Sequence, residues 1–172
     1  MILGLDLSLT CTGWARLNPD GTHTTGCIPT NSQRPTGERL LRIVTEIFHG
    51  PAWSPDVTLA VGIESGVVRS NAALAIGMVH GAVRLELWRH DTIIVDITPA
   101  TRCKLATGKG NAGKAEVFAA AIHRLGYQGH SDDEADALWI ADATARILGV
   151  CNRPPLPATH LRALDKLKPK AA

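Results

Sequence analysis

The order of short apolar segments along the chain limits its possible folds more than any other feature. Three strand-like segments come first, at 1–7, 12–18 and 22–29, and the turn signal "NPDG" joins the last two. Helical and strand-like patterns then alternate, with strands at 57–64 and 92–97 and helices at about 36–49, 71–89, 114–125 and 130–149. Strands joined by tight turns pair antiparallel, whereas strands separated by helices pair in parallel. We therefore predict an α/β fold whose five-stranded mixed sheet is antiparallel at one edge and flanked by helices.

Length and composition are those of one globular domain. The chain has 172 residues, of which 45% are hydrophobic, so a sizeable core can form. We expect the domain to cover 1–152, and a basic, proline-containing tail over 153–172 to be loosely held. The sequence has no run of 18 apolar residues and no signal-peptide pattern, so we expect a cytoplasmic protein without a membrane segment.

The four cysteines are scattered along the chain without a CxxC pair: Cys11, Cys27, Cys103 and Cys151. Structural zinc sites commonly use such pairs, so the spacing argues against a zinc site. In a cytoplasmic protein, we expect all four thiols to be reduced.

Positive charge is concentrated in two segments although the net charge is only +2. Residues 98–115 contain four basic side chains and no acid: Arg102, Lys104, Lys109 and Lys114. The tail after residue 152 is also basic, with Asp165 as its one acid. Such segments favour a polyanionic partner, and the alternative is an ordinary solvated surface.

Two acids occupy strand positions where a carboxylate is costly to bury. Asp6 interrupts the apolar segment that opens the chain, and Glu64 ends the apolar run "VTLAVGIE". Functional groups of α/β sheets gather near the ends of strands. If the first and fourth strands are neighbours, Asp6 and Glu64 lie side by side.

Two further acids, Asp133 and Asp136, stand three residues apart near the start of the last predicted helix. The S-x-x-E pattern at 131–134 is a capping box that begins this helix. Asp136 continues an apolar stripe, so we expect it to face the core with Asp133 one turn above it. We expect Asp142 and Arg146, four residues apart, to pair on the solvent-facing stripe.

Four carboxylates in a small volume need compensation by cations. Mg²⁺ prefers oxygen ligands, and two ions about 4 Å apart can activate water against a phosphodiester. The nucleotide-binding pattern G-x-x-x-x-G-K-[ST] does not occur in the chain, so we expect no nucleotide cofactor. Acids together with basic segments predict metal-dependent phosphodiester hydrolysis.

Five motifs in order resemble those of the RuvC-type Holliday-junction resolvases, which have an RNase H-like fold. The likeness runs from about residue 2 to residue 148. The motifs are "ILGLDLSLTCTGWA", "GIES", "NAALAIGMVHG", "GKGNAGK" and "DEADAL".

The resemblance implies particular roles for residues at the matching positions. The metal ligands would be Asp6, Glu64, Asp133 and Asp136, holding two Mg²⁺ ions for which Mn²⁺ can substitute. Lys114 would act at the scissile phosphate. Further DNA contacts are expected from Lys104, Lys109, Arg102, Arg69 and Asn71. The resemblance also implies a homodimer, formed through the helix at 71–89, that holds a four-way DNA junction.

One departure from the family pattern keeps the substrate range open. Val67 stands where bacterial members can carry a phenylalanine that stacks at the junction, and valine cannot stack on a base in that way. A broader nuclease for forks and flaps is therefore the main alternative. A junction-binding protein without activity is a second alternative. The stretch "GLDLSLTCTG" also resembles the first phosphate motif of the sugar-kinase and actin ATPases, which makes an ATP-binding domain a remote third.

Overall fold

A single five-stranded sheet organises the protein in a computed structural model that describes residues 1–65, 73–150, 152–153 and 155–167. The strands are β1 (Ile2–Asp6), β2 (Cys11–Leu17), β3 (His23–Pro29), β4 (Ala60–Glu64) and β5 (Ile93–Ile97). Their order in the sheet is β3-β2-β1-β4-β5. The β1–β2 and β2–β3 pairs are antiparallel, and the β1–β4 and β4–β5 pairs are parallel. The predicted mixed sheet is confirmed.

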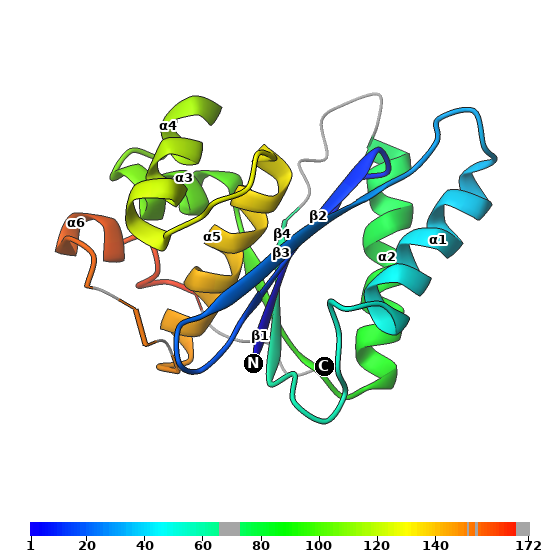
Figure 1. The fold of residues 1–172 in the computed structure, drawn as a ribbon, viewed down its shortest axis with the longest axis horizontal. Helices are drawn as coiled ribbons and strands as arrows, with labels where there is room; N and C mark the ends of the chain where they lie inside the picture. The colour runs from blue at the N-terminus through cyan, green and yellow to red at the C-terminus, as the bar shows by residue number, and fades with distance from the viewer. Residues whose placement is uncertain (66–72, 151, 154, 168–172) are drawn as a thin grey trace.

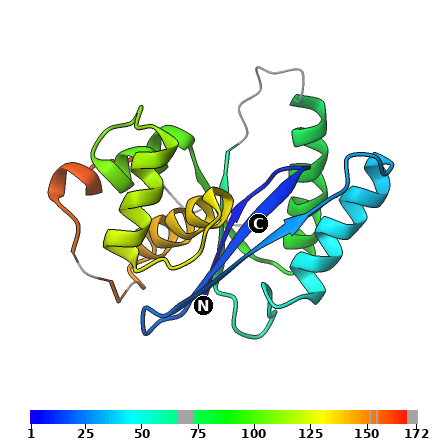
Figure 2. The same cartoon turned by 45° about the horizontal axis from the view of Figure 1, so that its top comes forward.

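Helices cover both faces of the sheet (Figures 1 and 2). One face carries α1 (Thr36–His49) and α2 (Ala73–Arg89). The other face carries α5 (Asp132–Ile147), with four shorter elements packed beyond it. These are α3 (Pro99–Thr107), α4 (Lys114–Ala120), the π-helical turn η1 (Ala121–Leu125) and α6 (Ala158–Leu161). Each face of the sheet has its own hydrophobic core, as strands buried on both sides require. None of the described helices is long and apolar enough to cross a membrane.

Helix α5 is buried on almost every side because it lies between the sheet and the α3–α4 layer (Figure 1). Every residue from Ala135 to Ala145 is buried, including Asp142, which is 0% exposed. The pairing of Asp142 with Arg146 is confirmed at 2.7 Å, but its expected position on a solvent-facing stripe is wrong. Arg153, which follows the helix, approaches the same carboxylate at 3.7 Å.

Three glycines allow α5 to lie directly on the strands. A Cβ atom at Gly4, Gly13 or Gly62 would overlap atoms of α5, among them the backbone carbonyl oxygens of Ala137 and Asp133. These glycines lie on β1, β2 and β4, so three neighbouring strands have no side chain at the points where the helix crosses them. This close packing fixes where the acidic start of α5 lies relative to the strands.

The ends of the helices agree only in part with the sequence pattern. Thr98 caps α3, its hydroxyl accepting a hydrogen bond from the backbone N–H of Thr101 at 3.1 Å. Ser131 is the N-cap of α5, but the predicted capping box does not form. The Glu134 carboxylate instead accepts hydrogen bonds from the hydroxyl groups of Thr25 and Tyr127.

The described part of the C-terminal segment packs against α3, which differs from the loosely held tail that we expected. His160 on α6 is buried, and its Nδ1 lies 2.8 Å from the carbonyl oxygen of Leu105. Leu156, Leu161 and Leu164 join the core on this side of the sheet.

Candidate active site

Asp6 and Glu64 lie next to each other at the ends of two neighbouring parallel strands. The register of β1 and β4 pairs Leu5 with Ile63, so the next residue of each strand is the acid. Both side chains are partly buried. The expected juxtaposition of the two strand acids is therefore confirmed.

The first turns of α5 bring two more acids to the same place. Asp6 is paired across the sheet with Gly13, and the backbone carbonyl of Asp133 lies directly over that glycine. One turn further along α5, Asp136 is only 6% exposed. The structure thus brings together four acids, of which the first, Asp6, and the last, Asp136, are 130 residues apart in the sequence.

Burial and repulsion by neighbouring carboxylates raise the pKa values of Asp6, Asp133 and Asp136. Burial is the main cause that raises the pKa of Asp6 to about 7, followed by the charges of Glu64 and Asp136, while Arg102 opposes the rise. Burial likewise raises the pKa of Asp136 to about 6 against the opposing effect of Arg102. Burial also raises the pKa of Asp133, and Lys114 counteracts it. Carboxyl groups perturbed in this way mark a functional site.

Arg102 is the counter-ion at the centre of the acids. Its Nε lies 2.6 Å from the Glu64 carboxylate, and its Nη1 pairs with Asp136. The side chain is buried and directed at the two carboxylates, and the DNA contact expected of Arg102 stays a prediction. Arg102 is found here because α3 starts directly after β5, the strand beside β4.

The acids fit a divalent cation chemically. They offer hard carboxylate oxygens, and within the described residues no hydrogen bond or ion pair engages the largely buried Asp6 carboxylate. A buried carboxylate without such a partner favours a bound cation. In the structure, Glu64 and Asp136 are arranged around Arg102, so one guanidinium supplies part of this compensation.

The expected basic residues differ in their relation to the acids. Lys114, exposed at the start of α4, lies 3.4 Å from Asp132 and interacts electrostatically with Asp133 and Asp136. Lys109 is exposed and lies 3.6 Å from Glu116. Lys104 is half-buried on α3. Arg69, Asn71 and Val67 lie outside the described residues.

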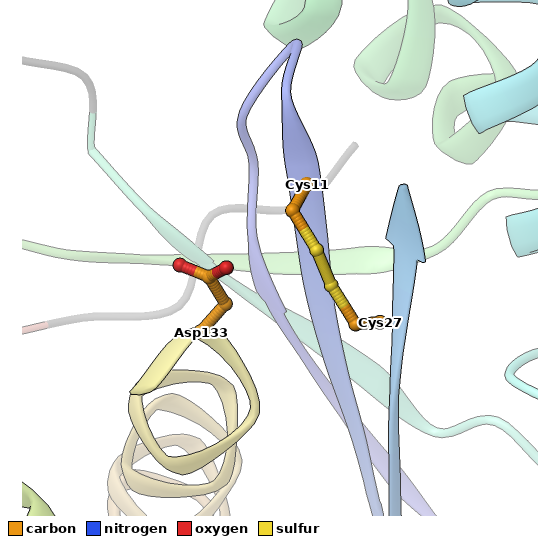
Figure 3. A group of neighbouring side chains, drawn as sticks. All are labelled: Cys11, Cys27 and Asp133. Atoms are coloured by element: carbon orange, nitrogen blue, oxygen red, sulfur yellow. A yellow bond between two sulfur atoms is a disulfide. The ribbon is translucent and has the colours of Figure 1, made fainter. Parts of the chain in front are cut away.

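Two cysteines near the acids were not anticipated. Cys11 on β2 and Cys27 on β3 form a disulfide, which contradicts the expectation of four reduced thiols. In the described part of the chain, one group of three potential metal ligands lies within 4.8 Å, namely Cys11, Cys27 and Asp133 (Figure 3). No CxxC spacing marks this group of three in the sequence, because each of its residues comes from a different element. Strand pairing across the 18–21 turn was the available signal.

Comparisons with known proteins find relatives that match most of the chain. A family model described as crossover junction endodeoxyribonuclease RuvC matches residues 2–144. The RuvC endonuclease of Synechococcus sp. (strain WH7803) is 33% identical over 147 residues, which cover 81% of this chain and 94% of that protein. The RuvC endonuclease of Chlamydia muridarum is 28% identical over 176 residues, which cover 98% of this chain and 96% of that protein.

Solved structures confirm the fold. The Thermus thermophilus RuvC structure matches with a TM-score of 0.68 and 22% identity, covering 98% of this chain and 99% of that one. T. thermophilus RuvC in complex with a Holliday junction substrate matches with a TM-score of 0.67 and 24% identity, covering 89% and 98%. The RNase H-like architecture implied by the motifs is therefore correct.

Proposed function

The chain belongs to the RuvC family of crossover junction endodeoxyribonucleases, and we propose that it resolves four-way DNA junctions by hydrolysing one phosphodiester bond in each of two strands. One observation carries the proposal: acids from β1, β4 and α5 meet at one edge of the sheet. Because such a set is costly without cations, its presence is best explained by metal-dependent chemistry on a phosphate.

The metal ligands in this proposal are the four carboxylates of Asp6, Glu64, Asp133 and Asp136. They would hold two Mg²⁺ ions, and Mn²⁺ would substitute because both cations accept oxygen ligands. When bound, two such ions activate a water molecule and stabilise the leaving oxygen of the phosphodiester. Asp6 lies on the central strand of the sheet and interacts electrostatically with the other three acids, so it would be a ligand in this set.

The cationic side chains have separate roles in the same proposal. Lys114 is exposed beside the acids, so its ammonium group can contact a phosphate oxygen of the strand to be cut. Lys104, Lys109 and, from the sequence alone, Arg69 and Asn71 would contact the DNA backbone. Arg102 pairs with Glu64 and Asp136 and would supply part of the charge compensation that they need.

A homodimer would present two such sites to one junction. Four large apolar side chains of α2 are between 42 and 79% exposed: Leu74, Met78, Leu85 and Trp88. Their spacing of four, seven and three residues puts them on one stripe, opposite the residues of α2 that pack on the sheet. A single stripe of this kind favours pairing with the same helix of a second copy, and a two-fold dimer matches a four-way junction.

The test compares cleavage of a four-way junction, a Y-shaped fork and a linear duplex of equal arm length, each with Mg²⁺. We expect paired, symmetric nicks in the junction. Asp6→Asn removes one charge with little change in shape, so it should abolish cleavage while leaving junction binding intact. Full cleavage by Asp6→Asn would contradict the proposed site.

The same assay distinguishes junction resolution from the main alternative, a broader nuclease for forks and flaps. Equal rates on the fork and the junction, without paired nicks, would assign the chain to broader branched-DNA cleavage. Val67 is the sequence feature that favours this outcome, because it cannot stack on a base.

A further inference from the structure

Cys11 and Cys27 lie on one face of the sheet, under the start of α5. In the register of β2 and β3, Cys27 is paired with Gly13, and Cys11 stands two residues before that glycine. Side chains two residues apart on a strand point to the same face, so both sulfurs share the face on which Asp133 covers Gly13. The two Cα atoms are 6.1 Å apart.

The Asp133 carboxylate completes a group of three. One sulfur of each cysteine and one oxygen of Asp133 lie within 4.8 Å of one another, and all three residues are half-buried (Figure 3). The three ligands come from β2, β3 and α5, so the rigid packing of the helix on the strands holds them together.

We propose that these three side chains bind one Zn²⁺ ion when the disulfide is reduced. A dithiol reductant supplies two electrons and two protons, converts the disulfide to two thiols, and is itself oxidised to a disulfide. Binding of Zn²⁺ then displaces both thiol protons, leaving thiolate ligands. Thiolate sulfur selects zinc over magnesium, and three protein ligands leave the fourth tetrahedral position to water.

Small movements are enough to form the site. Zinc lies about 2.3 Å from sulfur and about 2.0–2.2 Å from a carboxylate oxygen. A tetrahedral ion at those distances requires ligand atoms nearly 4 Å apart. The two bonded sulfurs must therefore move apart after reduction, whereas an Asp133 oxygen already lies within 4.8 Å of both. The backbone of β2 and β3 can remain paired while the two sulfurs separate.

The functional consequence rests on the function proposed above. Asp133 is one of the four carboxylates assigned to Mg²⁺, so an Asp133 oxygen engaged by zinc is lost to the catalytic ions. Zinc at this site therefore inhibits cleavage in the reduced protein. A small-molecule disulfide accepts two electrons from the two thiolates, is itself reduced to thiolates, and re-forms the Cys11–Cys27 bond, which releases the zinc and abolishes that inhibition.

The binding test uses the full chain with Co²⁺ as a spectroscopic probe and Zn²⁺ as competitor. Reduced protein should bind one Co²⁺ with a thiolate-to-cobalt charge-transfer band, and oxidised protein should show no such band. Cys11→Ser and Cys27→Ser should each weaken binding at least about 10- to 100-fold, the loss seen even for partners outside the ligand shell. Cys103→Ser, at the free thiol on α3, is the matched control and should bind like the parent protein.

Thermal unfolding of each variant without metal shows whether it is folded. Unchanged cobalt binding by folded Cys11→Ser and Cys27→Ser would overturn the proposed site, and so would a missing charge-transfer band in reduced parent protein.

The inhibition test measures junction cleavage in Mg²⁺ with increasing Zn²⁺. Reduced parent protein should lose activity when one equivalent of zinc is bound, whereas folded Cys11→Ser should stay active at the same zinc concentration. Equal zinc sensitivity of the two proteins would overturn the inhibitory role. If the parent protein bound zinc through its thiols but cleaved no branched DNA in Mg²⁺, the function proposed above would fail and the zinc site would stand.

Discussion

At the residue scale, Asp6 couples folding stability to pH. Its pKa is raised from 3.8 to about 7, mainly by burial and then by Glu64 and Asp136. Since the raised value belongs to the folded state, the protonated form is the one that favours folding. The stability that this proton provides is complete below about pH 4 and is lost as the pH rises through about 7.

Asp6→Asn should therefore stabilise the metal-free protein at pH 8 but not at pH 4. A shift of about three pKa units sets an upper limit of about 4 kcal/mol on the gain. Urea denaturation with a chelator at both pH values measures the difference. Addition of Mg²⁺ should reduce the gain, because cations compensate the carboxylate of the parent protein. An equal effect of the substitution on the free energy of unfolding at both pH values would contradict the cost that we assign to the buried, charged Asp6 carboxylate.

Arg102 leads to a second prediction at this scale. Removing one partner of a buried charge network leaves the others uncompensated, at a cost of about 3–5 kcal/mol. Arg102→Met should lower the metal-free stability by about this amount at pH 8, and Mg²⁺ should restore more stability to the variant than to the parent. Denaturant unfolding with and without Mg²⁺ measures both effects. Arg89→Met is the control, because Arg89 pairs with Glu86 at an exposed site.

The sequence predicted the four acids but not their counter-ion, for a physical reason. An acid inside an apolar strand or stripe is conspicuous because burial penalises it wherever the strand lies. Arg102 stands in a helix among other basic residues and looks like a surface cation. Its burial depends on β5 lying beside β4, and that is a property of the assembled sheet.

At the element scale, α5 shows what a helical pattern can and cannot determine. Its start near residue 131 and the inward position of Asp136 follow from the sequence. The burial of Asp142 does not, because it depends on the packing around the helix in the assembled fold, where Arg153 from the segment after the helix approaches its carboxylate. The Cys11–Cys27 pair was missed for a similar reason, since it needs the register of two strands.

Gly13→Ala tests whether close packing of α5 positions the acids. A methyl group would overlap the Asp133 carbonyl, so the helix must shift. We expect a loss of stability of about 1–3 kcal/mol from overpacking and a larger fall in junction cleavage than that loss explains. Thermal unfolding and cleavage rates below the melting range measure the two effects separately.

Gly37→Ala is the matched control for that substitution. A Cβ atom at Gly37 meets nothing within 4 Å, and Gly37 lies in α1, which packs on the face of the sheet opposite α5 (Figure 1). Because alanine favours a helix more than glycine does, the control should keep its cleavage activity, and its free energy of unfolding should rise by up to about 1 kcal/mol. A Gly13→Ala variant as stable and active as this control would show that the close approach is dispensable.

At the scale of the whole molecule, the two faces of the sheet have different tasks. Helix α5 lies on one face of the sheet and α1 and α2 lie on the other (Figure 1). The α5 side carries the acids, Arg102 and Lys114, whereas the other side carries the exposed apolar stripe of α2. An apolar stripe exposed on a monomer is a usual sign of a protein contact. Pairing through α2 would therefore leave the acidic edge of each copy accessible to DNA.

Leu85→Glu tests this arrangement by placing a charge within the stripe. Light scattering during size-exclusion chromatography should show a dimer for the parent and a monomer for the variant, because a buried unpaired carboxylate opposes association. Leu41→Glu is the matched control, since Leu41 is 68% exposed on α1 and lies outside the stripe. In junction cleavage, the monomeric variant should cut the two strands independently, so that singly nicked junctions accumulate while the control still releases resolved duplexes. A Leu85→Glu variant that remains dimeric and produces paired nicks would exclude α2 as the contact, because the charge would then lie in solvent.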